Sequence, residues 1–100
     1  MAYVYASLER VTTGNILTSI SGSAIVVINY CIGAGAATFV NFQDEDGVVL
    51  TGRIPLGTSV PYTFVGGRDS AAFEVPRDKS LAIRMSAATT VGGHFAYYTV

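Results

Sequence analysis

The last 21 residues constrain the fold more than any other part of the chain. Leu81, Ile83 and Met85 alternate there with less apolar positions, which is the period of two that a half-buried strand requires. A loop rich in small residues follows at 87–93, and residues that favour strands resume at 94–100. The pattern predicts a closing β-hairpin made of two strands.

The second arm of this hairpin carries apolar or aromatic side chains on both faces. Phe95 and Tyr97 share one face, whereas Ala96, Tyr98 and Val100 share the other. If the chain's own second sheet leaves the Tyr98 face open, we expect a neighbouring subunit to cover it.

The rest of the chain repeats short β-rich runs separated by turn residues. The predicted strands cover residues 2–9, 15–20, 24–32, 38–43, 48–54, 59–65, 72–75, 80–86 and 94–100. No run has the 3.6-residue period and the caps of a helix. The even spacing predicts an all-β fold, an antiparallel β-sandwich of jelly-roll type with about eight or nine short strands. At this length we expect residues 1–100 to form a single β-sandwich domain.

Local signals refine this order of strands. Residues 24–32 are apolar on both faces, so we expect a central strand covered on one side by the core and on the other by a neighbouring chain. Asp46 and Gly47 form the dipeptide typical of a tight hairpin turn. Pro55 is expected to interrupt pairing, and Pro61 places its strand at an edge or a bulge.

The composition indicates a protein that assembles. Charged residues make up 13% of the chain, against about 25% in typical soluble domains. A small domain normally keeps a well-charged surface to stay soluble and monomeric. We therefore expect partner subunits to cover much of the exterior, as in a homo-oligomer.

Several function classes find no support in the sequence. The net charge is −1 and the cationic residues are scattered, which argues against nucleic-acid binding. These residues are Arg10, Arg53, Arg68, Arg77, Lys79 and Arg84. The single cysteine, Cys31, is expected to be a small buried hydrophobe, and the N-terminus does not resemble a secretory signal. The apolar window 24–40 is too short for a spanning helix, so we expect two strands joined by a Gly-Ala loop and no membrane contact.

Three motifs favour structural interpretations over chemistry. Residues 33–38 contain two glycines of a nucleotide-binding loop but lack the third glycine and the helix, so we expect a turn and no cofactor. The three consecutive acidic residues 44–46 lack the spacing of a calcium loop, so we expect a hairpin turn and no metal. His94 could act as a base for Cys31 or Ser86, but no nucleophile elbow accompanies it, so we expect no catalytic residue and no enzyme.

The tyrosines are the best candidates for contacts with a partner. Tyrosine suits sugar-binding platforms as well as protein interfaces, and the absence of tryptophan together with the low charge favours interfaces. The predicted interface residues are Tyr3, Tyr5, Tyr62, Tyr97 and Tyr98. We expect the N-terminal strand to pair with a partner's sheet edge, so that deleting residues 1–9 abolishes binding and leaves the domain folded.

Three segments in the C-terminal half, residues 48–57, 73–88 and 91–98, resemble small β-sandwich virion proteins of tailed bacteriophages, of the capsid cement or decoration type. The resemblance implies a non-enzymatic structural protein that stabilises the phage head by binding across capsomer seams as a homotrimer. The implied partner is the major capsid protein or another virion subunit. The implied location is the virion, after synthesis in the host cytoplasm. No individual functional residue follows from this resemblance.

The sequence is also compatible with two other functions. One is a carbohydrate- or receptor-binding β module of a phage tail, which would use the tyrosines as a sugar platform. The other is a head–tail connector or tail-completion protein, which would form rings. Sedimentation distinguishes them, because a trimer supports the cement protein and a large ring supports the connector.

Overall fold

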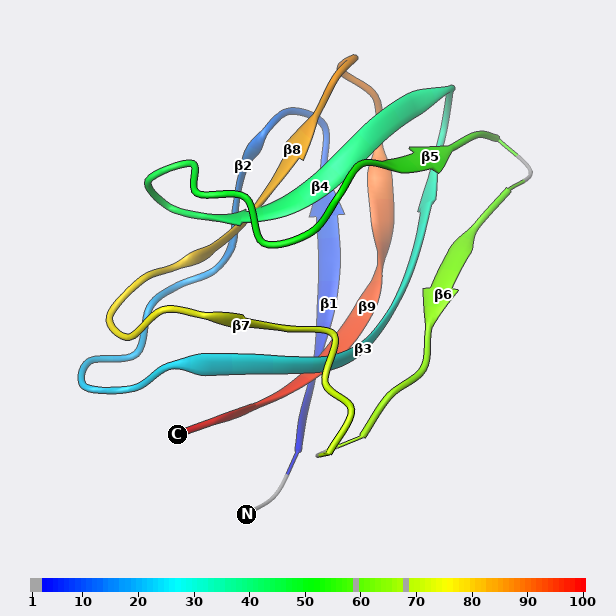
Figure 1. Ribbon diagram of the computed structural model, residues 1–100. Helices are drawn as coiled ribbons and strands as arrows, with labels where there is room; N and C mark the ends of the chain where they lie inside the picture. Colours follow the sequence, from blue (N-terminus) through cyan, green and yellow to red (C-terminus); the bar gives the residue numbers. More distant parts are fainter. Residues whose placement is uncertain (1–2, 59, 68) are drawn as a thin grey trace.

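Short, alternating strands build two antiparallel sheets that pack face to face (Figure 1). The computed structural model describes residues 3–58, 60–67 and 69–100, and these residues form nine strands and no helix. Sheet A contains β1 (Val4–Arg10), β3 (Ile25–Ala34), β6 (Tyr62–Phe64), β7 (Phe73–Val75) and β9 (Val91–Thr99). Sheet B contains β2 (Gly14–Leu17), β4 (Thr38–Asp44), β5 (Ile54–Leu56) and β8 (Leu81–Met85). None of the described residues lies in a helix that could cross a membrane.

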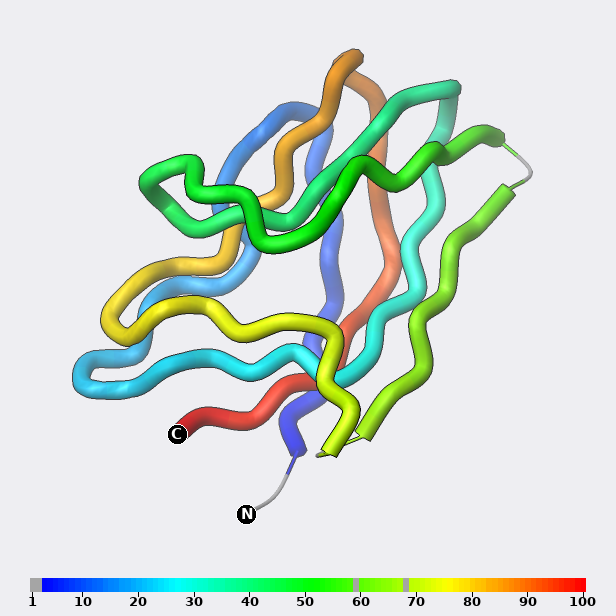
Figure 2. The backbone as a smooth tube through the Cα atoms, viewed as in Figure 1, coloured from blue at the N-terminus to red at the C-terminus, as the bar shows by residue number. Residues whose placement is uncertain are grey.

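The strand order is that of a jelly roll. Sheet A runs β1-β9-β3-β6, and β7 pairs with the other half of the same β3 edge, so that β6 and β7 share one position. Sheet B runs β2-β8-β4-β5. The chain passes repeatedly from one sheet to the other, as the tube in Figure 2 shows. The predicted all-β, jelly-roll-like sandwich is therefore confirmed.

The closing stretch forms two strands but no hairpin. β8 pairs with β2 and β4 in sheet B, whereas β9 pairs with β1 and β3 in sheet A. The connection crosses between the sheets, and Thr38 Oγ1 accepts a hydrogen bond from the Ala87 backbone N–H at 3.1 Å near its start. Both strands were predicted, although β9 begins at Val91, inside the predicted loop. Their pairing was wrong, because alternation identifies a strand but not its neighbour.

The main core lies between the sheets and follows the predicted alternation. Leu81 and Ile83 from sheet B and Phe95 from sheet A are fully buried there. On β1, Leu8 points into the core while Tyr5 on the opposite face is exposed. The radius of gyration, 12.7 Å, matches the roughly 13 Å expected of a compact chain of this length.

β3 contains a bulge and is buried on both faces at its Val26 end. The pairing with β9 shifts register between Val27 and Asn29, so side chains before and after the shift alternate in opposite phase. Val26 and Ile28 form a second apolar cluster with Ala96, and Tyr3, Ala71 and Tyr98 pack against it. The expectation that a neighbouring chain covers this face was wrong for the Val26 end, because the chain's own residues bury it.

The acidic turn forms as predicted, but the strand after it does not. Gly47 has a φ of 84°, and its N–H donates to the Asp44 carbonyl at 3.1 Å. The run 48–54 makes only one bridge, between Val49 and Gln43, before regular pairing resumes at β5. The turn is determined by its own residues, so the sequence predicts it. Whether the chain forms a strand after the turn depends on the residues with which that segment pairs.

Pro55 lies inside β5 and does not interrupt it. Pro55 is opposite Phe39, whose backbone groups both bond to Ser86, next to β8 on the other side of β4. The Phe39 N–H donates to Ser86 Oγ at 2.9 Å, and the Phe39 carbonyl accepts from the Ser86 N–H at 2.8 Å. β5 is also the edge of sheet B, so no ladder bond needs a Pro55 N–H. The prediction from Pro61 holds, because it directly precedes β6 at the edge of sheet A.

Residues 35–37 join β3 to β4 as the expected loop, but Gly33 and Ala34, which were predicted to belong to it, extend β3 and pair with β9. Some predictions involve residues outside the described part of the chain. They are the first residue of the strand predicted at 2–9, the first of the strand predicted at 59–65, and Arg68 among the cations.

Candidate functional site

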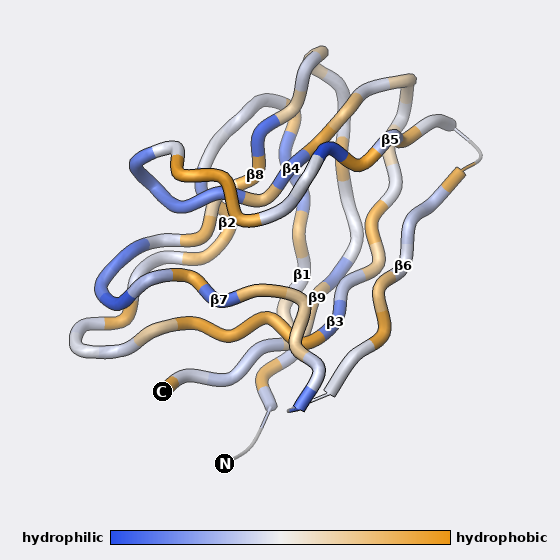
Figure 3. The backbone as a smooth tube through the Cα atoms, viewed as in Figure 1, coloured by the Kyte–Doolittle hydropathy of each residue, from blue (hydrophilic) through white to orange (hydrophobic). Residues whose placement is uncertain are grey.

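The three acidic residues at 44–46 stabilise the turn that follows β4 and connect it to the turn that precedes β8. Asp44 is buried, and its Oδ1 accepts hydrogen bonds from the N–H groups of Asp46 at 2.9 Å and Val48 at 3.0 Å. Glu45 Oε1 accepts from the Ser80 N–H at 2.7 Å, and Asp46 Oδ2 lies 2.6 Å from Lys79 Nζ. Figure 3 shows these two hydrophilic turns side by side at one end of the sandwich. Each carboxylate therefore has its own structural partner.

The ion pair also affects the lysine. Its hydrogen bond with Asp46, and secondarily the negative charge of Asp46, raise the pKa of Lys79 above its ordinary value. Among the residues described, no group of three or more His, Cys, Asp or Glu side chains is placed to hold a metal ion.

Cys31 and His94 face each other across β3 and β9. The Cys31 Sγ accepts a hydrogen bond from Thr63 Oγ1 at 3.4 Å, and the His94 side chain is exposed. Ser86 lies at the end of sheet B, where its Oγ accepts from the Phe39 N–H at 2.9 Å. The structure thus brings the Cys31 and His94 positions together and leaves Ser86 on the opposite sheet. Cys31 is only half-buried, because it lies on the outer face of sheet A.

The five predicted interface tyrosines lie in different environments. Tyr5 is 73% exposed on the outer face of sheet A, and Tyr62 is exposed at the edge strand β6. Tyr3 and Tyr98 stack on each other with ring centroids 6.0 Å apart. Tyr97 is only 8% exposed and belongs to the main core beside Phe95, so its ring is not accessible to a partner.

A hollow of about 270 Å³ lies on the outer face of sheet A. Strand register places Tyr5, Ala96 and Asn29 in one row across β1, β9 and β3, with His94 and Cys31 in the next row. The described residues that line the hollow include no Asp, Glu, Lys or Arg. Val65, at its rim, is 82% exposed. The hollow is therefore uncharged, whereas the exposed Glu9 and Glu74 lie elsewhere on this face of sheet A.

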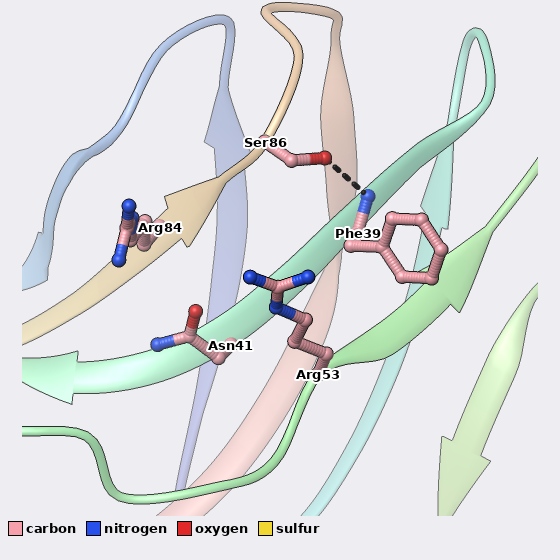
Figure 4. Close-up of a pocket in the computed structure, with 5 residues that line it drawn as sticks. All are labelled: Phe39, Asn41, Arg53, Arg84 and Ser86. Atoms are coloured by element: carbon pink, nitrogen blue, oxygen red, sulfur yellow. Dashed lines mark hydrogen bonds between the residues drawn. The ribbon is translucent and has the colours of Figure 1, made fainter.

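The outer face of sheet B carries a different arrangement, which the sequence did not reveal. Asn41 on β4 is directly opposite Arg84 on β8, and Val40 pairs with Ile54, so that Arg53 comes alongside Asn41 on the other side. Figure 4 shows the Asn41 amide between the two guanidinium groups. The three side chains surround a small cavity of about 40 Å³, beside Phe39 and Ser86.

Asn41 is the unusual member of this row. The residue is 8% exposed, and its Nδ2 is buried without a hydrogen-bond partner among the described residues. Leaving a buried donor unsatisfied costs roughly 1–3 kcal/mol. The sequence gives one weak signal for the row, since Asn41 and Arg84 are polar residues at outward positions within apolar strands. Their proximity depends on the strand order, which no local pattern predicts.

No family model, no curated protein and no solved structure matches this chain. The jelly-roll architecture is shared by capsid proteins, lectins and cupins. Because unrelated functions use the same fold, the fold leaves the function open.

Proposed function

We propose that this chain is a non-enzymatic structural protein of a tailed-phage particle, a capsid cement or decoration protein that binds across capsomer seams. The proposal is supported mainly by one observation: the outer face of sheet A combines an edge strand, an uncharged hollow and large exposed apolar side chains. The partner in this proposal is the major capsid protein or another virion subunit.

The chemistry of this face suits protein association. Among the described residues, Tyr5 and Val65 are the two most exposed large apolar side chains, and both line the hollow. Burying apolar surface stabilises a complex by about 25 cal/mol per Å², less the entropy lost on association. Tyrosine is enriched at such interfaces because its rigid ring covers a large area.

The edge strand adds a second mode of contact. β1 is the outermost strand of sheet A and, within the described part of the chain, pairs only with β9, over seven residues. A strand from a neighbouring subunit can add to such an edge through backbone hydrogen bonds. A homotrimer would present three copies of this surface to the shell, which raises avidity without new contacts.

The test of this proposal needs a substitution that leaves the fold intact. Deleting residues 1–9 does not meet this condition, because β1 pairs with β9 along its length and supplies Leu8 to the core. Tyr5→Asp instead places a charge on the exposed face. We expect the variant to keep its β circular dichroism spectrum but to lose trimer formation in sedimentation and binding to stripped particles.

The matched control is Val48→Asp, at an exposed valine on the acidic turn away from sheet A. This variant should behave like the wild type. Full particle binding by a folded Tyr5→Asp protein would contradict the proposal, and a large ring in sedimentation would support a connector.

A carbohydrate-binding module is the second candidate, and the same hollow favours it. The Tyr5 ring, the Asn29 amide and the His94 imidazole offer a stacking surface and polar groups to a sugar. Glycan-array binding that is lost in Asn29→Ala, while particle binding persists, would favour this function. Tyr97→Ala is unsuitable for this test because it would remove a core side chain.

A further inference from the structure

We propose that Arg53, Asn41 and Arg84 form a binding site for one tetrahedral oxyanion, a phosphate or sulfate group, on the outer face of sheet B. This site lies on the opposite sheet from the proposed assembly surface and does not rest on the proposed function. The inference is based on unbalanced charge, on an unsatisfied buried donor and on the cavity between them.

The first observation is electrostatic. Arg53, just before β5, and Arg84 on β8 flank Asn41 from opposite sides of β4, and two like charges on one face of a sheet repel each other. The only ion pair among the described residues joins Lys79 to Asp46, so neither arginine has an acidic partner there. An anion of charge between −1.5 and −2, as phosphate has near neutral pH, would neutralise both guanidinium groups.

The second observation is the amide. Asn41 Nδ2 is buried, lacks a partner among the described residues, and lines the same small cavity as both arginines. Side chains directly opposite each other in a sheet have Cβ atoms about 5 Å apart. The Asn41 and Arg84 side chains can therefore reach one ligand together, and Arg53, just before β5, lines the same cavity.

The number of donors favours a tetrahedral ligand. Two planar guanidinium forks and one amide can each take a separate oxygen of phosphate or sulfate, whereas a carboxylate has two oxygens and a single charge. The cavity, at about 40 Å³, has room for a single small group. Phe39, which is 47% exposed beside it, offers an apolar surface to whatever carries the anion.

The experiment is an amide-resonance NMR titration of the intact protein with inorganic phosphate, against sodium chloride at equal ionic strength. We expect saturable shifts at the backbone amides of Phe39, Asn41 and Arg84. Arg53→Gln and Arg84→Gln should each weaken binding about tenfold or more, since hydrogen bonds between charged groups are the strong ones. Arg77→Gln removes the same charge at an exposed turn far along the chain and should bind like the wild type.

Titrations with other ligands show which anions the site selects and whether it takes a free or an esterified phosphate. Sulfate should bind at the same residues. Glycerol 3-phosphate binding more tightly than inorganic phosphate identifies an esterified phosphate as the ligand, and equal binding identifies the free ion. The proposal is overturned if phosphate gives no more than the chloride response, if acetate binds as tightly as phosphate, or if folded Arg53→Gln and Arg84→Gln proteins retain wild-type affinity.

Discussion

Gly93 occupies a position in β9 that only glycine can fill. Its φ is 149°, and a Cβ built there would collide with the carbonyl oxygen of Cys31 on the neighbouring strand. Glycine tolerates both conditions because it has no side chain. This residue therefore allows β9 and β3 to approach closely at the rows that carry Cys31 and His94.

Gly93→Ala is expected to lower the free energy of unfolding by about 3 kcal/mol or more, from backbone strain together with the steric clash. Urea denaturation measures the loss. Gly52→Ala is the control, because nothing lies within 4 Å of a Cβ at that position and its φ is not in the left-handed region. Equal stability of the two variants would contradict this account of Gly93.

Tyr30 makes stability sensitive to alkaline pH. Burial, and secondarily the neighbouring Tyr62, raise the pKa of Tyr30 to about 12, from an ordinary value of 10. The folded state then holds this proton more tightly than the unfolded state, so the stabilisation is complete below pH 10 and is lost as pH rises towards 12. The raised pKa of Lys79 acts in the same direction.

Tyr30→Phe keeps the aromatic contacts with Phe42 and Phe64 and removes this ionisation. We expect the variant to lose less unfolding free energy than the wild type between pH 10 and pH 12, as measured by urea denaturation at each pH. Lys79→Gln serves as a control that removes the other contribution. Identical pH profiles for Tyr30→Phe and the wild type would show that Tyr30 has no such role.

Single residues also explain what could be predicted from the sequence. The period of two correctly put Leu81 on the buried face of its strand, because alternation follows directly from strand geometry. The same alternation placed Tyr97 with Phe95, yet tyrosine's preference for interfaces made it a candidate contact. Burial outweighs residue type at this position, since the jelly roll covers that face of β9 with sheet B.

The acidic turn between β4 and β5 shows how an element is held by its own side chains. Asp44 accepts two backbone hydrogen bonds inside the turn, and Glu45 bonds to the backbone at the start of β8. Residues 44–46 were correctly predicted as a turn from the Asp-Gly signal. The bonds to Ser80 and Lys79 were beyond prediction, since they join segments about 35 residues apart.

Asp44→Ala should lower the free energy of unfolding by about 2 kcal/mol, because the turn loses a buried charged acceptor of two hydrogen bonds. Glu74→Ala removes an exposed carboxylate from β7 and should change stability by less than about 0.5 kcal/mol. Thermal or urea denaturation of the three proteins checks both values. An Asp44→Ala protein as stable as Glu74→Ala would mean that the turn does not depend on Asp44.

The whole molecule presents two unlike outer faces on one jelly roll. The outer face of sheet A carries an uncharged hollow and ends at the edge strand β1, while that of sheet B carries the row of Arg53, Asn41 and Arg84. The fold class was predictable because strand spacing and turn residues repeat along the chain. The composition of the two outer faces was not predictable, because register and strand order decide which outward residues become neighbours.

The proposed structural role in a particle is tested most directly by the copy number of this chain in purified, intact virions. Quantitative mass spectrometry can measure the ratio of this chain to the major capsid protein after particles are washed in high salt. The proposal predicts a fixed ratio in every preparation, and loss of the chain from particles when Tyr5→Asp replaces the wild type. Absence of the wild-type chain from washed particles, or a trace amount that varies between preparations, would contradict it.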